Sequence, residues 1–188
     1  MATAADGSFG RSDAFEAARS GDLAAFEKLM RQHERLVLGT AVRLTGSIED
    51  ARDISQEVFL KLYRNLGKVH ASGAISSWLY RVTVNACHDV LRKRRPETPV
   101  EDAGPLAADD ADPHEAVADS ERRRALDLSL RMLPEKERAA LVLRDIEGLS
   151  TEEVARALGS SEATVRSQIC KARVKMKSFI ERYMGRRS

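Results

Sequence analysis

The 188-residue sequence has few aromatic residues, few cysteines and no long apolar run. Phe, Trp and Tyr together make up 5% of the chain, and Trp78 is its only tryptophan. No stretch approaches the ~18 consecutive apolar residues that a membrane-spanning helix needs. The first residues lack a basic patch followed by an apolar core, so no secretory signal is expected. Together these absences predict a cytoplasmic protein.

The cysteines and histidines give no readable metal site or disulfide framework. Cys87 and Cys170 lie far apart, neither belongs to a CxxC pair, and the four histidines form no HxxxH or HExxH pattern. Cys87 beside His88 could be half of a metal site, or a partly buried thiol next to a surface imidazole. No nucleophile is paired with a base, and no carboxylate cluster suggests metal-dependent chemistry. We therefore predict a binding protein without cofactor or metal, and not an enzyme.

The charges are unevenly distributed along the chain, although the net charge is only +2. Residues 1–95 hold 15 Lys/Arg and 11 Asp/Glu, and residues 122–188 hold 16 and 9. Residues 96–121 hold no Lys/Arg and 9 Asp/Glu. Two basic ends thus flank an acidic middle, which favours nucleic acid as a partner of the ends.

Proline and helical periodicity divide the chain into two helical modules. Residues 96–118 carry four prolines with no helical apolar period, so they predict a flexible acidic linker. Elsewhere, apolar residues recur at helical spacing between capping residues such as Asp22 and stops such as Gly46. The fold class predicted is all-α, with two small helical domains. The expected division is an N-terminal extension over 1–21, a first domain over 22–95, the linker over 96–119, and a second domain over 120–188. Helices are expected over about 23–44, 48–66 and 74–94, then 121–132, 135–147, 151–158 and 162–183.

The last two helices have the spacing of a helix-turn-helix. Ser150 and Glu153 form a capping box before a short helix, Gly159 breaks that helix, and Ser161 caps a longer, basic helix. Val165, Ile169, Ala172 and Met176 fall on one stripe that would pack against Val154, Ala155 and Leu158 of the short helix.

The opposite face of the long helix carries residue types suited to DNA. Arg can bind guanine through two hydrogen bonds, Ser can donate or accept, and further cations can neutralise phosphates. The alternative is that these charges merely solvate a surface helix. Against this, charge, turn and cap coincide here, and only Glu181 offsets eight Lys/Arg over residues 164–187.

Two further polar surfaces are expected in the first module. The second helix has an acidic face, which is either solvated or binds a basic protein. The third helix carries a polar stripe that could contact DNA bases or phosphates. Trp78 next to that stripe either packs in the core or stacks on an unpaired base. The acidic face comprises Asp50, Asp53, Gln56 and Glu57, and the stripe comprises Arg81, Asn85, His88 and Arg92.

Taken together, the two modules resemble an extracytoplasmic-function (ECF) sigma factor of bacterial RNA polymerase. The matching stretches are IEDARDISQEVFLKLYRNL, AISSWLYRVTVNACHDVLRKRR and LPEKERAALVLRDIEGLSTEEVARALGSSEATVRSQICKAR. They occupy both modules in order, at the spacing of the family. The resemblance implies a factor that binds polymerase core enzyme and directs promoter-specific initiation. It departs from the family at Gln168, Cys170 and Asp89, which leaves the promoter sequence open.

The resemblance also implies roles for each surface. The acidic helix would bind the clamp helices of the polymerase β′ subunit, and the second module would also meet the β flap. The third helix and the loop from Lys68 to Ser77 would recognise and melt the −10 element, with Asn85 helping to hold a flipped base. The helix-turn-helix would read the −35 element, the acidic linker would run through the polymerase, and an anti-sigma factor would sequester the chain. The residues implied are Asp50, Asp53, Gln56, Glu57 and Leu60 for core binding; Lys68, Trp78, Arg81, Asn85, His88 and Arg92 for the −10 element; and Thr164, Arg166, Ser167, Cys170, Lys171 and Arg173 for the −35 element.

Three other classes of protein are weighed against this interpretation. A stand-alone helix-turn-helix regulator would bind promoters without polymerase, and the acidic face argues against it. A recombinase would need a catalytic Ser, Tyr or carboxylate constellation, which is not visible. A pure interaction protein should not carry a basic recognition helix.

Overall fold

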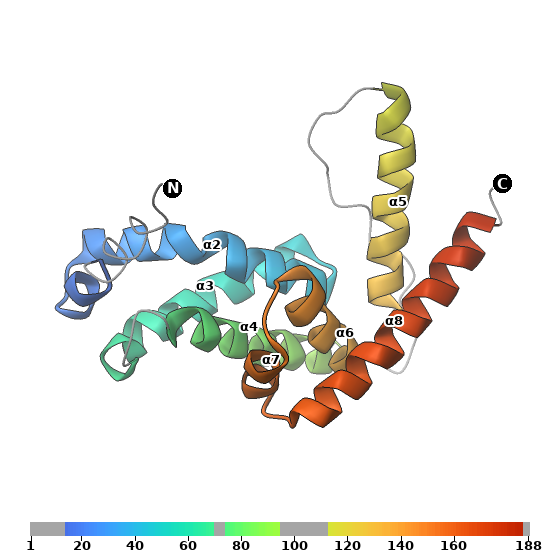
Figure 1. Cartoon of the computed structure of the whole chain (residues 1–188). Helices are drawn as coiled ribbons and strands as arrows, with labels where there is room; N and C mark the ends of the chain where they lie inside the picture. The colour runs from blue at the N-terminus through green and yellow to red at the C-terminus, as the bar shows by residue number, and fades with distance from the viewer. Residues whose placement is uncertain (1–13, 70–73, 95–112, 186–188) are drawn as a thin grey trace, which may run out of the picture.

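The computed structural model describes residues 14–69, 74–94 and 113–185, and within these ranges the regular structure is entirely helical (Figure 1). The predicted all-α fold class is therefore confirmed. None of the helices in the described ranges combines the length and apolar character needed to cross a membrane.

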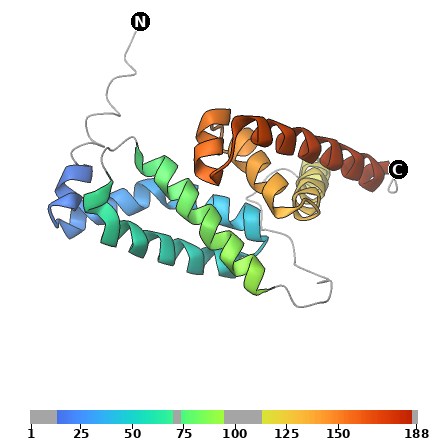
Figure 2. The ribbon, with the colours of Figure 1, turned by 90° about the horizontal axis from the view of Figure 1, so that it is seen from below.

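The first module consists of three long helices and two short segments. Residues 14–19 form a short helix, followed by α2 (Leu23–Thr45), α3 (Ile48–Asn65), the 3-10 turn η1 (Leu66–Lys68) and α4 (Ala74–Lys93). In Figure 2, α4 crosses α2 and α3, and all three helices contact one another. Apolar side chains from each helix, such as Val37, Ile54 and Leu79, are fully buried between them.

Local capping explains where these helices begin and end. The carboxylate of Asp22 accepts hydrogen bonds from the backbone N–H groups of Ala24 and Ala25, at 2.8 and 3.1 Å. Gly46 ends α2 with φ +72°, a left-handed conformation that favours glycine. The predicted cap and stop of this helix are both confirmed.

The second module contains the long helices α5 (Pro113–Arg131) and α8 (Glu162–Gly185) with shorter ones between them. These are α6 (Glu135–Leu141), the π-helical turn η2 (Val142–Ile146) and α7 (Thr151–Leu158). Two details differ from the expectation. Helix α5 begins at Pro113 rather than at Glu121, since proline is well tolerated in a first helical turn. The helix expected over 135–147 changes to π geometry after Leu141.

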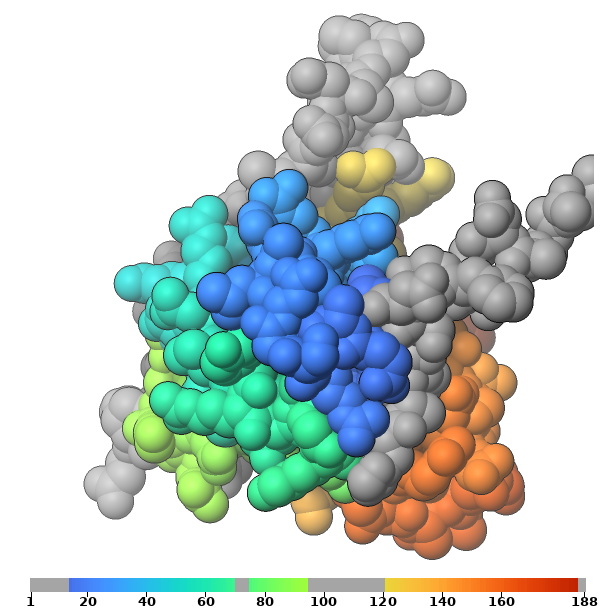
Figure 3. Space-filling view, turned by 90° about the vertical axis from the view of Figure 1, so that its left-hand side faces the viewer, coloured from blue at the N-terminus to red at the C-terminus, as the bar shows by residue number. Residues whose placement is uncertain are grey.

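The two modules pack against each other. Helix α4 contacts α7, and α2 contacts η2, α5 and α6. The buried apolar residues of both modules form one continuous cluster. Viewed from the side of the N-terminal helical segment, the first module fills most of the face and the second module borders it (Figure 3). The predicted linker falls largely on residues 95–112, which lie outside the described part of the chain.

Part of the expected N-terminal extension belongs to the first module. Phe15 is 1% exposed and Ala18 is also buried, and both join the core cluster. Residues 1–13 lie outside the described ranges.

Candidate functional site

The solvent-facing side of α3 forms the predicted acidic face. Asp53, Gln56, Glu57 and Leu60 are exposed and follow one another at helical spacing along a single side. Glu57 forms an ion pair of 2.6 Å with Lys61, one turn later. Leu60 is 52% exposed, so the face combines acidic and amide groups with an accessible apolar side chain. Such a surface suits a basic protein partner with an apolar contact at its centre.

Asp50, the fifth residue predicted for this face, is placed elsewhere. Its side chain is only 11% exposed and forms an ion pair with Arg94, which follows α4. Its backbone N–H donates to the hydroxyl of Ser47 at 3.3 Å, so Ser47 caps α3. The Asp50 carboxylate pairs with Arg94. It does not complete a capping box with Ser47.

Sequence reasoning missed an apolar extension of the acidic face. Tyr63 is 48% exposed, and its ring meets the edge of Phe26 with centroids 5.0 Å apart. Leu23, at the start of α2, is 67% exposed. The helical spacing of Leu60 and Tyr63 could have indicated their common side. The contact that Phe26 of α2 makes with Tyr63 could not be predicted, because it depends on how α2 packs against α3.

The polar stripe predicted on α4 is present. Arg81, Asn85 and Arg92 are exposed, and Arg92 pairs with Asp89 at 3.1 Å. His88 is partly buried, and Lys68 is exposed in η1. Residues 70–73, in the loop expected to hold a flipped base, lie outside the described ranges.

Trp78 follows the first of its two expected alternatives, packing against the core, and stacking on an unpaired base stays a prediction. Its side chain is partly buried and packs against the core cluster. Part of the ring remains accessible on α4, so core packing positions an aromatic surface beside the polar stripe.

The helix-turn-helix forms as predicted. The hydroxyl of Ser150 accepts from the backbone of Glu153 at 3.2 Å, and the Glu153 carboxylate accepts from the backbone of Ser150 at 2.8 Å. The hydrogen bond from the Ser150 backbone N–H, followed by an interaction with the Ser150 side chain, lowers the pKa of the Glu153 carboxyl group. Gly159 ends α7 with φ +58°, and α8 follows after a short turn. The stripe predicted to pack on α7 is buried at Val165, Ile169 and Ala172.

The outer face of α8 presents most of the predicted −35 residues to solvent. Thr164, Ser167, Cys170 and Lys171 are exposed. Arg166 is exposed but its guanidinium is paired with Glu162, one turn earlier. A side chain held in this way can exchange a carboxylate for a base or phosphate at little net cost.

Arg173 is engaged with the second module itself. Its guanidinium donates two hydrogen bonds to the carboxylate of Asp145, at 2.9 and 2.7 Å. This arrangement turns Arg173 toward η2. The Arg173 side chain nevertheless stays 62% exposed, seven residues after Arg166 on the same helix.

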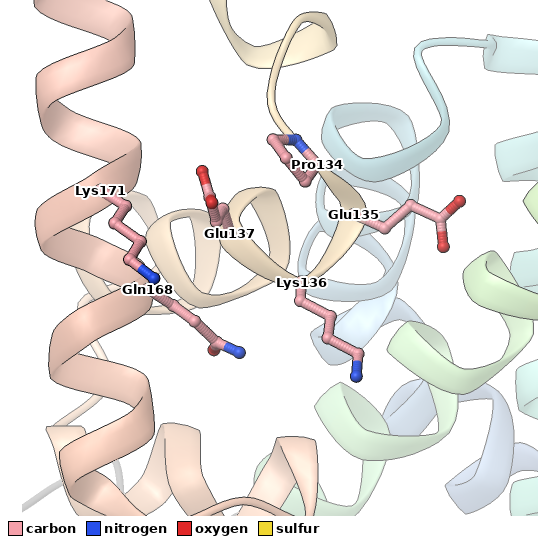
Figure 4. Close-up of a pocket in the computed structure, with 6 residues that line it drawn as sticks. All are labelled: Pro134, Glu135, Lys136, Glu137, Gln168 and Lys171. Atoms are coloured by element: carbon pink, nitrogen blue, oxygen red, sulfur yellow. The ribbon is translucent and has the colours of Figure 1, made fainter.

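A cavity of about 410 Å³ lies between α8 and the start of α6. Figure 4 shows Gln168 and Lys171 on α8 opposite Glu137 and Lys136 on α6. Glu137 is paired with Lys175 at 2.8 Å, which offsets its charge. Lys136 is a cation near the recognition helix that sequence reasoning did not include, because it precedes the helix-turn-helix in the chain.

A second groove, of about 480 Å³, lies between η2 and the C-terminal half of α8. Its floor is apolar, with Leu141, Ile146, Met176 and Ile180. Its rim is charged, because two ion pairs flank it: Asp145 with Arg173 at 2.7 Å, and Lys177 with Glu181 at 3.9 Å. An apolar groove with a charged rim suits an amphipathic helix.

The cysteines occupy different environments. Cys87 is buried in the first module, where burial first and the charge of Asp50 second raise the pKa of its thiol to about 12. Cys170 is exposed on α8. Among the described residues, no group of three or more His, Cys, Asp or Glu side chains could hold a metal ion.

Comparison with known families matches both modules separately. Residues 29–97 match the Sigma-70 region 2 family, and residues 123–176 match the Sigma-70, region 4 family. The ECF RNA polymerase sigma factor SigM of Mycobacterium tuberculosis is 38% identical over 159 residues, which covers 84% of this chain and 78% of SigM. SigE of Mycolicibacterium smegmatis is 37% identical over 170 residues, or 87% of this chain. This chain spans 66% of the length of SigE.

Solved structures share the fold. The structure of CnrH in complex with the cytosolic domain of CnrY superposes with a TM-score of 0.67 at 26% identity, covering 91% of this chain and 97% of that one. The sigma factor RpoE of Bartonella quintana, in complex with the anti-sigma factor NepR, gives a TM-score of 0.69 at 18% identity over 83% of this chain and 96% of that one. The matches to region 2 and region 4, in this order, agree with the relatives SigM and SigE, which are both named ECF RNA polymerase sigma factors. The chain belongs to the ECF family of RNA polymerase sigma factors.

Proposed function

We propose that this sigma factor binds RNA polymerase core enzyme through the exposed side of α3 and selects promoters through α4 and α8. The observation that carries the proposal is the separation of charge between these helices. Asp53 and Glu57 give α3 an acidic side, while Arg166 and Lys171 give α8 a basic one. Acidic side chains repel DNA phosphates, so the two surfaces are suited to different partners.

Core binding is assigned to Asp53, Gln56, Glu57 and Leu60, which correspond to the β′ clamp-binding face implied by the family. The exposed side chain of Tyr63 would enlarge the contact. Asp50 contributes by fixing the start of α3 rather than by touching the polymerase, because Arg94 occupies its carboxylate.

Promoter recognition is assigned to two helices. The polar stripe on α4, with Lys68 and the accessible part of Trp78, would bind the −10 element, where stacking on an aromatic ring stabilises an unpaired base by ~1–3 kcal/mol. The exposed side of α8 would enter the major groove of the −35 element. There Thr164, Arg166 and Ser167 lie closest to the helix N-terminus, where base contacts are usually made.

The groove between η2 and α8 is assigned to the β flap of the polymerase. Its apolar floor and charged rim support an amphipathic helical element as its occupant. An anti-sigma factor is the remaining proposed partner, since the similar protein CnrH was solved in complex with the cytosolic domain of another protein, CnrY. Acting with polymerase, the chain would work in the cytoplasm.

Run-off transcription with a purified bacterial core enzyme on a randomised promoter library tests the proposal. We expect start sites enriched for one pair of −35 and −10 sequences at a fixed spacing. A library transcribed without any start-site preference above that of core enzyme alone would contradict the proposed function. Binding of a single promoter by the free chain as a dimer would instead support a stand-alone regulator.

A further inference from the structure

A third cavity, of about 250 Å³, lies between α4 and the start of α8. One side of it is apolar, where Val84 and Leu158 meet. The rest of its lining is polar and comes from three helices and from the turn between α7 and α8: Asn85, His88, Lys136, Ser160, Thr164 and Gln168. Pockets for drug-sized molecules usually occupy about 300–1,000 Å³, so this cavity suits a smaller, polar occupant.

Two polar atoms of this lining are buried without a hydrogen-bond partner. They are Nε2 of His88 on α4 and Oε1 of Gln168 on α8. Buried polar groups in native proteins are nearly always paired with protein, water or a ligand, because an unpaired one costs free energy. Since both residues line one cavity from different helices, a single occupant could contact both side chains.

The lining carries positive charge and no carboxylate. Lys136 supplies an ammonium group, and neither Asp nor Glu is among the lining residues. Figure 4 shows the side chains of Lys136 and Gln168 extending in the same direction from their helices. Two acidic residues close to the lining in sequence are already paired, Glu137 with Lys175 and Glu162 with Arg166. The charge balance of the cavity therefore favours an anion.

The first turn of α8 adds hydrogen-bond donors and partial positive charge. The hydroxyl of Ser161 accepts from the backbone N–H of Thr164 at 3.2 Å. The other N–H groups of a first helical turn have no partner within the helix, and the positive end of the helix dipole favours anions. The two unpaired side chains can donate as well. The amide of Gln168 exchanges its O and N atoms by a half-turn, and Nε2 of His88 donates in the tautomer that carries its proton there.

We propose that this cavity binds a small phosphoryl oxyanion, either inorganic phosphate or a phosphate monoester. Lys136 supplies the charge, while His88 and Gln168 supply the buried hydrogen bonds. The apolar side at Val84 and Leu158 accommodates the carbon group of an ester. An oxyanion held here contacts both modules, so its binding adds to the stability of their packing. The site is a property of the free chain and does not rest on the proposed function.

Calorimetric titration of the free, full-length chain with inorganic phosphate, at constant ionic strength in a chloride buffer, tests the proposal. We expect saturable binding of one phosphate per chain. Lys136→Ala should weaken this binding by about tenfold or more, because it removes a charged partner of the ion. Lys28→Ala removes the same charge from an exposed position on α2 and should leave the affinity unchanged.

Nitrogen–proton correlation spectra show where the ion binds. Phosphate should shift the backbone signals of Gly159 and Ser160 and the imidazole signals of His88 in the parent protein. The same additions should leave these signals of Lys136→Ala nearly unmoved. His88→Leu removes one of the buried donors without changing Lys136, so it should also weaken binding. Circular dichroism verifies that each variant is folded.

Methyl phosphate distinguishes the two sources of the oxyanion. Tighter binding than that of inorganic phosphate would assign the site to an ester, and equal or weaker binding would assign it to the free ion; both support the proposal.

Three outcomes would overturn it. The first is no saturable phosphate binding, which would leave the cavity to water. The second is equal affinity of the parent and Lys136→Ala. The third is a shift of the Gly159, Ser160 and His88 signals with a short DNA duplex but not with phosphate, which would assign the unpaired groups to DNA. The run-off assay enters none of these measurements, so the site and the proposed function can fail independently.

Discussion

Asp50 and Arg94 form an ion pair that joins the first turn of α3 to the residue following α4. The carboxylate is largely buried while the guanidinium is about half exposed. The Asp50 carboxylate therefore relies on Arg94 to stabilise its charge. The Arg94 guanidinium can be solvated by water. The sequence predicts that Asp50 contacts the polymerase. In the structure, its ion pair with Arg94 instead fixes the start of α3, and so positions the acidic face.

Asp50→Asn should lower the free energy of unfolding by about 1–2 kcal/mol, because it removes the negative partner of an ion pair from a largely buried site. Asp53→Asn, on the exposed side of the same helix, should change stability by less than about 0.5 kcal/mol. Urea denaturation followed by circular dichroism measures both. Equal stability of the two variants would show that the pair contributes nothing.

The converse is expected for polymerase binding. Asp53→Lys combined with Glu57→Lys should abolish co-purification with core enzyme and leave the helical content intact, since both side chains are exposed. Glu152→Lys, an equally exposed reversal on α7, serves as the control and should co-purify normally. Retention of the double variant at parent levels would refute the assignment of the acidic face.

The helices were predictable because their signals are local. Asp22, Gly46 and Ser150 each specify a helix end through contacts within a few residues, and the apolar stripe of α8 follows from helical spacing alone. The surfaces exposed by α3 and α8 follow from the same periodicity.

What could not be predicted depends on contacts between distant residues. The guanidinium of Arg138 reaches the carbonyl of Leu44, 94 positions earlier, and Tyr80 reaches Glu147, 67 positions later. No local pattern distinguishes these side chains from solvated ones. An acidic, proline-rich segment between two modules predicts a flexible tether whether or not the modules touch. Phe15 was missed for the same reason, because only its burial against the core reveals its role.

Arg166→Ala should weaken holoenzyme binding to the −35 element by ~1–3 kcal/mol and relax sequence preference there, as expected for an arginine that contacts a base. Arg173→Ala provides the contrast on the same helix. Its guanidinium is held by Asp145, so we expect a smaller loss and an unchanged preference. Competition binding with substituted −35 sequences measures both quantities. A preference unchanged by Arg166→Ala would count against the assigned recognition face.

Ser150→Ala should destabilise the second module by about 1 kcal/mol, because the backbone N–H of Glu153 loses its acceptor and the capping box opens. Folding lowers the pKa of Glu153. The Glu153 carboxylate therefore stabilises the folded protein fully above the ordinary carboxyl pKa. This stabilisation is lost as the pH falls through the lowered pKa. Urea midpoints of the two proteins should draw closer between pH 7 and acidic conditions without meeting, because the hydrogen bond from the Glu153 N–H to the Ser150 hydroxyl does not titrate. Parallel curves would show that the box does not account for the lowered pKa.

Tyr80 makes the packing between the two modules sensitive to alkaline pH, because its hydroxyl donates to Glu147 of the second module. Burial, followed by the negative charge of Glu147 and its hydrogen bond, raises the pKa of Tyr80 well above its ordinary value of 10.0, while Arg43 opposes the rise and Glu153 adds to it. A group with a raised pKa in the folded state contributes stability that is complete below its unfolded pKa and lost as the pH rises beyond it. The packing between the two modules should therefore weaken above about pH 10.

The phenylalanine variant isolates this effect. Tyr80→Phe has no ionisable hydroxyl, so the part of the alkaline destabilisation that arises at the interface should disappear, although Cys87 still titrates in both proteins. Energy transfer between one dye on the exposed Cys170 and another on a Gln32→Cys substitution in α2, measured from pH 8 to 11, should fall in the parent and stay flat in the variant. Equal falls in both would place the alkaline transition elsewhere in the chain, because only Tyr80 links an ionisable hydroxyl to Glu147.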